Sequence, residues 1–382
     1  MTGDVGAGAK VLVAGDTCVG PGALPRNVGS PPWLVFREDL REHDLALVNV
    51  ECPLTYRPPC LGKSGPCLTG DPVLARLLSA GGFHVATLAN NHVLDAGSDG
   101  LRDTIAACSD AGLAVVGAGM SLDAAETPLS QTLGGVRIAI LACAEREFSI
   151  AGARTPGAAP LDPWRTPVLV RQAAAVSDVV LVILHGGNEH YPLPRPGLVA
   201  VCRALVDAGA HAVICHHSHV AGPVEVYQGA PIAYGTGNFL FPSDSPRKSA
   251  WHLGYLVSLR LTVQGVMAFE LLPYQQSVNG VDVQRMGDAD EEAFLVRLQE
   301  DARVVADPEA LASAWEHYCL KQRSYYLYAT LGLTRIERRL LRSGVWPVWR
   351  RRRRRIPELL NLLTCDSHRE AAETIFSREK WS

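Results

Sequence analysis

The stretch His211–Val220, HAVICHHSHV, joins a short apolar run to three histidines within four positions. Ala212-Val213-Ile214 has the aliphatic, β-branched character of a strand that is buried on both faces. His216, His217 and His219 follow directly, where such a strand would end. The hydrophobic pattern does not require imidazoles there, so their clustering points to a functional site at the carboxyl end of a strand.

Similar apolar runs recur along the chain and alternate with helical patterns. Residues 71–80, 101–111 and 196–208 carry apolar residues at helical spacing. The other predicted strands are Lys10–Ala14, Leu45–Val50, His84–Leu88, Val136–Ala142, Val179–Leu184 and His211–Ile214. This alternation predicts an α/β layered fold with at least some parallel sheet. From Ala230 to Pro273 strand patterns follow one another without helices, which predicts a second, largely antiparallel sheet or an antiparallel edge.

The pattern becomes helical after about residue 288. We therefore expect a catalytic domain over residues 8–287 and a helical C-terminal extension over residues 288–382, packing on or near the site. Six consecutive arginines, Arg350–Arg355, interrupt the extension. Such a run most often forms a solvated face or a flexible segment, and a binding arm for an acidic peptide is the alternative. The sequence does not decide its role.

Composition excludes several classes of protein. The net charge of −3 over 382 residues is too close to neutral to suggest a nucleic-acid partner, and no apolar stretch reaches the length of a membrane span. The N-terminus, MTGDVGAGAKVLVAGD, lacks the features of a secretory signal. Several of the ten cysteines lie within apolar runs, which is typical of free thiols in a reducing compartment. We expect a cytoplasmic protein.

Polar side chains also follow the other predicted strands. They are Asp16, Asn49, Glu51, Asn90, Asn91, His92, Asp95, His185, Glu189 and His190. Ligands of open α/β sheets bind at the carboxyl ends of strands, and carboxylate, amide and imidazole groups together suit a divalent metal. Each residue alone has a structural explanation: Asp16 could be a helix N-cap and Glu189 an exposed loop charge. The recurrence at five strand ends favours a shared metal site.

Five motifs resemble the successive signatures of the CapA family, which is named for poly-γ-glutamate capsule synthesis. They are GD (15–16), NVECPLT (49–55), LANNHVLDAG (88–97), HGGNEHYPLPRP (185–196) and HHSHVAGPVEVYQGAPIAYGTGNFLF (216–241). The resemblance covers roughly residues 8–275. It implies the calcineurin-like metallophosphoesterase fold, a four-layer α-β-β-α sandwich with a metal site at one edge.

The resemblance also implies a ligand set, namely Asp16, Asn91, His185, His217 and His219, with Glu51 where phosphoesterases place a bridging aspartate. His92 matches the histidine beside the amide ligand. Two departures weaken a two-metal centre: Asp16-Thr17-Cys18 replaces Asp-x-His, and Asn-x-Glu replaces Gly-Asp-x-x-Asp. We therefore expect one divalent ion, with calcium or manganese favoured over zinc or iron, and no organic cofactor.

Histidines left over from metal binding suggest acid–base chemistry. His92, His190 and His216 remain, with Asp95 and Glu189 as partners. The soluble N-terminus and helical extension resemble family members that epimerise lasso-peptide precursors. We therefore predict a metal-dependent peptide epimerase that inverts the Cα of a precursor peptide's C-terminal residue, with that peptide and peptide-processing proteins as partners. The alternatives are a metal-dependent hydrolase of phosphoesters or amides, a capsule-polymer biosynthesis protein, and a scaffold without catalytic activity.

Overall fold

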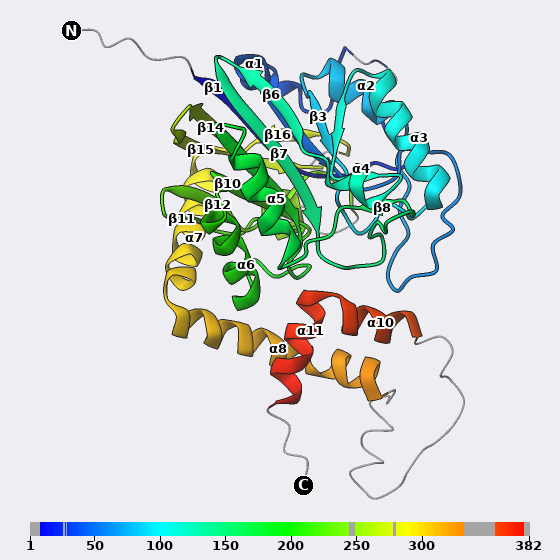
Figure 1. Ribbon diagram of the computed structural model, residues 1–382, viewed down its shortest axis with the longest axis vertical. Coiled ribbons are helices and arrows are strands. Elements are labelled where there is room, and N and C mark those ends of the chain that lie inside the picture. Colours follow the sequence, from blue (N-terminus) through cyan, green and yellow to red (C-terminus); the bar gives the residue numbers. More distant parts are fainter. Residues whose placement is uncertain are drawn as a thin grey trace, which may run out of the picture.

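The computed structural model describes residues 8–25, 27, 29–243, 249–277, 280–331 and 356–377. Two sheets lie face to face between two layers of helices (Figure 1). The four-layer α-β-β-α sandwich expected from the resemblance is present, with a helical C-terminal extension. Arg350–Arg355 lie outside the described residues.

The first sheet has eight strands. Their order is β16 (Val283–Arg285), β15 (Gly265–Gln276), β14 (Leu253–Thr262), β1 (Ala9–Thr17), β2 (Leu45–Val50), β3 (Val85–Thr87) and β4 (Ala114–Val116), with β13 (Asn238–Leu240) pairing with β1. Strands β1 to β4 run parallel, whereas β14 and β15 extend the sheet antiparallel beyond β1. Of the strand patterns predicted after Ala230, those from Leu253 onward therefore form an antiparallel edge of the first sheet, whereas Ala230–Ala233 joins the second sheet.

The second sheet has six strands. Their order is β11 (Val224–Tyr227), β12 (Ala230–Ala233), β10 (Ala212–His216), β9 (Val179–His185), β7 (Val136–Ala144) and β6 (Leu129–Leu133). The four central strands are parallel. Strands β5 (Ala118–Gly119) and β8 (Gly157–Ala158) form a separate pair. The predicted strands in this sheet are confirmed, and β7, β9 and β10 each continue one or two residues past the predicted end.

Helices cover the outer faces of both sheets. The remaining helices before the extension are α1 (Arg37–Glu42), α2 (Val73–Ala80), α3 (Gly97–Asp110), α4 (Leu122–Glu126), α5 (Arg165–Ala174) and α6 (Pro196–Asp207), with short 3-10 turns at Leu34–Phe36 and Ala250–His252. In β9, Val180 and Val182 pack with α5 and α6, while Leu181 packs toward the first sheet. Because side chains alternate along a strand, a strand covered on both faces reads as a continuous apolar run.

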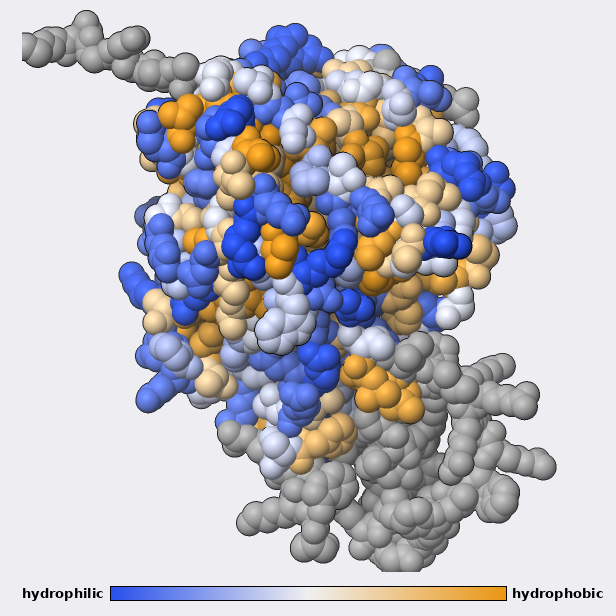
Figure 2. Space-filling model, viewed as in Figure 1, coloured by the Kyte–Doolittle hydropathy of each residue, from blue (hydrophilic) through white to orange (hydrophobic). Residues whose placement is uncertain are grey.

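The extension comprises α7 (Asp288–Ala306), α8 (Pro308–Leu331), α10 (Ile356–Thr364) and α11 (Asp366–Phe376), drawn from yellow to red in Figure 1. Helices α8, α10 and α11 share a small core that includes Trp315, Tyr326 and Leu362, and α11 also contacts α6. The division of the chain at residue 287 stays a prediction. Within the described ranges, no helix is long and apolar enough to cross a membrane. The face in Figure 2 intersperses hydrophilic and hydrophobic residues over the sandwich.

The close approach of β1 to β13 gives a stability prediction. A Cβ atom at Gly15 would lie 2.0 Å from the carbonyl oxygen of Gly237, which is backbone and cannot move aside locally. We expect Gly15→Ala to lower the free energy of unfolding by about 2 kcal/mol or more, as overpacking does elsewhere. Urea unfolding measures the loss. Gly20→Ala is the matched control because no heavy atom lies within 4 Å of its added Cβ; equal stability of the two variants would contradict the prediction.

Candidate metal centre

The six predicted metal ligands converge where the carboxyl ends of the two parallel sheets meet. Asp16 lies on β1, and Glu51 and Asn91 follow β2 and β3. His185 ends β9, and His217 and His219 follow β10. All six side chains are buried. The backbone nitrogen of His217 donates to Asp16 Oδ2 at 3.1 Å, which joins the two sheets directly.

The loop after β10 adopts an uncommon backbone conformation. His217 and His219 have φ values of 92° and 58°. Residues other than glycine rarely adopt positive φ, and such strain is typical of functional sites. The intervening Ser218 is fixed by a hydrogen bond from its hydroxyl to the carbonyl oxygen of Val220, at 2.8 Å. The loop thereby holds both imidazoles near Glu51.

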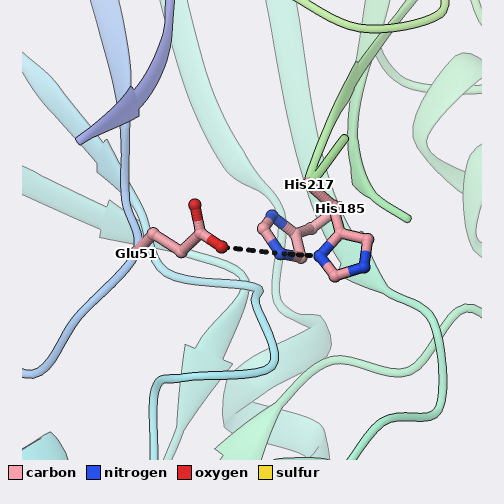
Figure 3. A group of neighbouring side chains, drawn as sticks. All are labelled: Glu51, His185 and His217. Atoms are coloured by element: carbon pink, nitrogen blue, oxygen red, sulfur yellow. Dashed lines mark hydrogen bonds and ion pairs between the residues drawn. The ribbon is translucent and has the colours of Figure 1, made fainter. Parts of the chain in front are cut away.

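The ligand atoms form two overlapping groups. One contains Glu51, His185 and His217, and the other contains Asp16, Glu51 and His219, with the atoms of each group within 4.8 Å of one another. Figure 3 shows Glu51 facing His185 and His217, which approach from the second sheet. Asn91 joins the first group, because its Oδ1 lies 3.1 Å from His185 Nε2.

The residues present fit a divalent cation. Both carboxylate oxygens of Glu51 are buried without a hydrogen-bond partner among the described residues, and its nearest imidazole nitrogens lie at 3.5 and 3.7 Å. Burial, and secondarily the charge of Asp16, raises the pKa of Glu51 well above its usual value. Burial, and then His217, lowers the pKa of His185 well below its usual value. A buried, unpaired carboxylate beside neutral imidazoles is an arrangement that a cation stabilises.

Both ligand groups contain Glu51, so the number of ions depends on which other donors each group offers. The first group offers four donors, counting Asn91, whereas the second offers three. Cys18, which replaces the histidine of the phosphoesterase motif, is buried, and a hydrogen bond with Cys52 together with burial raises the pKa of its thiol. Neither ligand group contains Cys18. The first group is the more complete one, and a single ion stays the expectation.

His92 and Asp95 form a pair beside this centre. His92 Nδ1 lies 2.7 Å from Asp95 Oδ2 and 3.0 Å from Lys63 Nζ, so a carboxylate and an ammonium group both hold the ring from its Nδ1 side. Sequence reasoning missed Lys63, whose ammonium group lies 2.6 Å from Asp95 Oδ1 and whose side chain is only 2% exposed. Its loop has no regular periodicity, and no local signal marks a buried lysine there. The catalytic role of the pair stays a prediction.

The other predicted acid–base residues occupy different environments. His216 is buried at the end of β10, where its Nδ1 lies 3.0 Å from Thr236 Oγ1 and 3.6 Å from Asp16 Oδ1. It therefore supports Asp16 from the interior. His190 and Glu189 are exposed at the rim, and the ring of His190 lies 6.2 Å from that of His219. Although desolvation alone would raise the pKa of Glu189, the charges of His217 and His219 lower it overall.

Three residues outside the predicted ligand set hold the ligands in place: Asn49, which the sequence analysis named among the strand-end residues, and Asn238 and Glu147, which it did not name. Asn49 Nδ2 donates to Asp16 Oδ1 at 2.6 Å, and Asn238 Oδ1 lies 2.9 Å from His219 Nδ1. Glu147 Oε2 accepts from Asn91 Nδ2 at 2.8 Å. Glu147 follows the strand predicted over Val136–Ala142, so the strand-end signal used for the ligands would have found it. Such outer partners fix the orientation of metal ligands.

Comparison with known proteins places the chain in a family. The model for bacterial capsule synthesis protein PGA_cap matches residues 10–243, which include every ligand named above. The chain belongs to this family. The residues that the match covers also contain His92, Asp95 and Lys63. The C-terminal extension lies outside the matched residues.

Individual relatives agree with this placement. The PGA biosynthesis protein CapA of Bacillus subtilis is 34% identical over 240 residues, 61% of this chain and 62% of that protein. A probable polyglutamine synthesis accessory protein of Mycobacterium tuberculosis is 32% identical over 267 residues, 65% of this chain and 70% of that protein. A putative 5'-nucleotidase structure from Staphylococcus aureus has a TM-score of 0.46 at 16% identity, over 77% of this chain and 58% of that one, which is too distant to inform the chemistry.

Glu51 gives a prediction on pH and metal dependence. Because burial raises the pKa of Glu51 in the folded, metal-free protein, the folded state keeps this proton to higher pH than the unfolded state, and stability falls as pH rises above the usual glutamate value. Glu51→Gln removes the free-energy cost of ionising this buried carboxylate. In EDTA at pH 8 we expect the variant to be about 1–3 kcal/mol more stable than wild type, with the difference vanishing toward pH 4.

Denaturant unfolding at both pH values checks this expectation. Addition of Mn²⁺ or Ca²⁺ should stabilise wild type and leave Glu51→Gln unchanged, because the shared carboxylate is lost. Glu292→Gln, at an exposed position on α7, is the control and should behave as wild type. A Glu51→Gln variant that is less stable than wild type in EDTA would show that this carboxylate is already neutralised without metal.

Proposed function

We propose that the protein is a metal-dependent peptide epimerase that inverts the Cα of a precursor peptide's C-terminal residue. The observation that carries the proposal is the His92–Asp95–Lys63 arrangement directly beside Asn91. Lys63 Nζ lies 2.6 Å from Asp95 Oδ1, and Asp95 Oδ2 lies 2.7 Å from His92 Nδ1. Both partners hold the His92 ring from its Nδ1 side, and in the proposal Nε2 is the nitrogen that acts as general base.

The candidate ligands would supply the second requirement of the reaction, which is a bound cation. Glu51, Asn91, His185 and His217 would hold the ion, and the oxygen-rich part of the set favours calcium or manganese. A bound divalent cation supplies positive charge near a substrate carboxylate, which stabilises the second negative charge that develops when the neighbouring Cα–H bond breaks. In this scheme His92 Nε2 takes the Cα proton, and the electron pair of the broken C–H bond delocalises into the adjacent carboxylate until a proton returns to the opposite face of the carbon. His190, exposed at the rim, is better placed to supply that proton than the buried His216.

We propose that the site takes the end of a peptide chain. His92 and the ligands are buried, whereas Trp251 and Phe241 are half-buried beside His219, with ring centroids at 4.7 and 5.3 Å from its ring. The aromatic rim offers a surface on which an apolar side chain can pack. A precursor peptide, presented by peptide-processing proteins in the cytoplasm, is the substrate and partner that we propose.

The experiment is solvent exchange in D₂O with a panel of peptides that end in aromatic residues. With Mn²⁺ or Ca²⁺ we expect deuterium at one Cα, inversion of that residue, and loss of both on chelation. His92→Gln should slow exchange by about 100-fold or more while leaving metal content unchanged. His317→Gln, exposed on α8, is the control. Release of phosphate or cleavage of a peptide bond without deuterium uptake would eliminate the proposal.

Hydrolysis is the second candidate function, and the sharing of Glu51 between two ligand groups favours it. A carboxylate common to two ligand groups is the arrangement that two-metal hydrolases use to activate water. It predicts a metal stoichiometry of two, solvent oxygen in the product, and no label at Cα. The relatives are named for capsule or polyglutamine synthesis, so a γ-glutamyl amide belongs in the substrate panel.

A further inference from the structure

Glu147 connects a metal ligand to the C-terminal extension. Its Oε2 accepts a hydrogen bond from Asn91 Nδ2 at 2.8 Å, and its Oε1 accepts one from Asn361 Nδ2 at 2.9 Å. Asn361 lies on α10, 214 residues further along the chain. Glu147 and Asn361 are both buried. The two carboxylate oxygens therefore have distinct partners, one in the centre and one in the extension.

This contact determines which way the Asn91 amide faces. Because Nδ2 donates to Glu147, Oδ1 points to the other side, where it lies 3.1 Å from His185 Nε2. A reversed amide would present two N–H donors to the cation and lose the ligand. Glu147 thus selects the metal-binding orientation, and Asn361 keeps Glu147 in place from behind.

Two further contacts dock the helical pair α10–α11 (residues 356–377) on the sandwich. His368 Nε2 lies 3.8 Å from Glu147 Oε1, and its Nδ1 lies 2.9 Å from the hydroxyl of Tyr326 on α8. Arg195 forms buried ion pairs with Glu145 and with Glu370 of α11. The Glu370 carboxylate also accepts from the backbone nitrogen of Gly197 at 2.9 Å. Glu145 and Glu147 both lie in the loop that follows β7. The contact of His368 with Glu147 and the ion pairs of Arg195 therefore meet at this one loop.

We propose that the helical pair α10–α11 is part of the metal centre, and that Asn361, acting through Glu147, is a positioning residue for the ligand Asn91. Docking of the helical pair and binding of the metal then stabilise each other, because a coupling of this kind is reciprocal. The inference rests on the metal site of the proposed function and not on the reaction assigned to it.

A second ion among Glu147, Cys365 and His368, whose ligand atoms also cluster, is disfavoured. Both oxygens of Glu147 already accept hydrogen bonds, and burial raises the pKa of the Cys365 thiol, whose sulfur lies 3.1 Å from Ser367 Oγ. Protonated thiols are poor metal ligands. The group is better explained as a hydrogen-bonded link.

The test uses a disruption and its rescue. Asn361→Asp places a carboxylate against that of Glu147, which should displace Glu147 and weaken Mn²⁺ binding by about 10-fold or more, the range seen for outer partners of metal ligands. Glu147→Gln added to the same chain should restore affinity, because the new amide donates to the carboxylate at 361 and accepts from Asn91. Glu147→Gln alone should have a small effect, because Asn361 Oδ1 lacks a partner among the described residues and can accept after the amide rotates.

Mn²⁺ and Ca²⁺ affinities are measured on the full chain by competition with a fluorescent chelator. Hydrogen–deuterium exchange over residues 356–377 gives the second readout: Mn²⁺ should slow exchange in wild type and in the double variant, and not in Asn361→Asp. Glu373→Gln, exposed on α11, is the control for a charge change on the helical pair.

Wild-type affinity in Asn361→Asp, or failure of Glu147→Gln to rescue it, would overturn the inference. Metal-independent exchange over residues 356–377 in wild type would also overturn it, because coupling requires both effects. These outcomes are separate from the test of the reaction. A wild-type protein that binds Mn²⁺ but incorporates no deuterium at Cα would remove the epimerase proposal and leave the coupling intact.

Discussion

The carboxylate of Glu51 is 0% exposed, and no described residue donates a hydrogen bond to either of its oxygens. A charge in that position destabilises the folded chain unless something neutralises it. The imidazole and amide groups around Glu51 lie where they could bind a cation together with its carboxylate. None of the described groups donates a hydrogen bond to Glu51. Burial raises the pKa of Glu51 and lowers the pKa of His185 for the same reason, because both side chains are removed from water between the two sheets.

Positioning Glu51 requires both sheets. Its backbone nitrogen donates to the carbonyl oxygen of Thr17 at 3.0 Å, so the residue after β2 is held against the end of β1 in the first sheet. The imidazoles come from the second sheet, on a loop whose positive φ values at His217 and His219 are costly in isolation. Packing of the two sheets over a common core offsets that cost. The site therefore depends on the sandwich as a whole, and a local change such as a side chain at Gly15 acts on it through the strands.

The family match and the contacts of the metal centre cover different parts of the chain. The PGA_cap match covers the ligands, whereas the contacts of Glu147 with Asn361 and His368 come from the extension beyond that match. The alignments with individual relatives span 62% of the Bacillus subtilis protein and 51% of a Bacillus anthracis capsule biosynthesis protein. The extension therefore reaches the metal centre from outside the residues that the family model matches.

The amino-acid sequence alone determined the layered α/β class, the positions of the main strands and the polar residues at their ends, because buried parallel strands are continuous apolar runs and polar residues at their ends interrupt that pattern. The resemblance to the CapA family then singled out the six residues that converge. The sequence did not place β14 and β15, since an antiparallel hairpin has the same local pattern at an edge as in a separate sheet. Only the tertiary structure showed that Lys63 is buried against Asp95, that His216 faces inward while His190 is exposed, and that Asn361 reaches Glu147. Those facts depend on contacts between segments far apart in the chain, and local sequence carries no record of which distant group a side chain will meet.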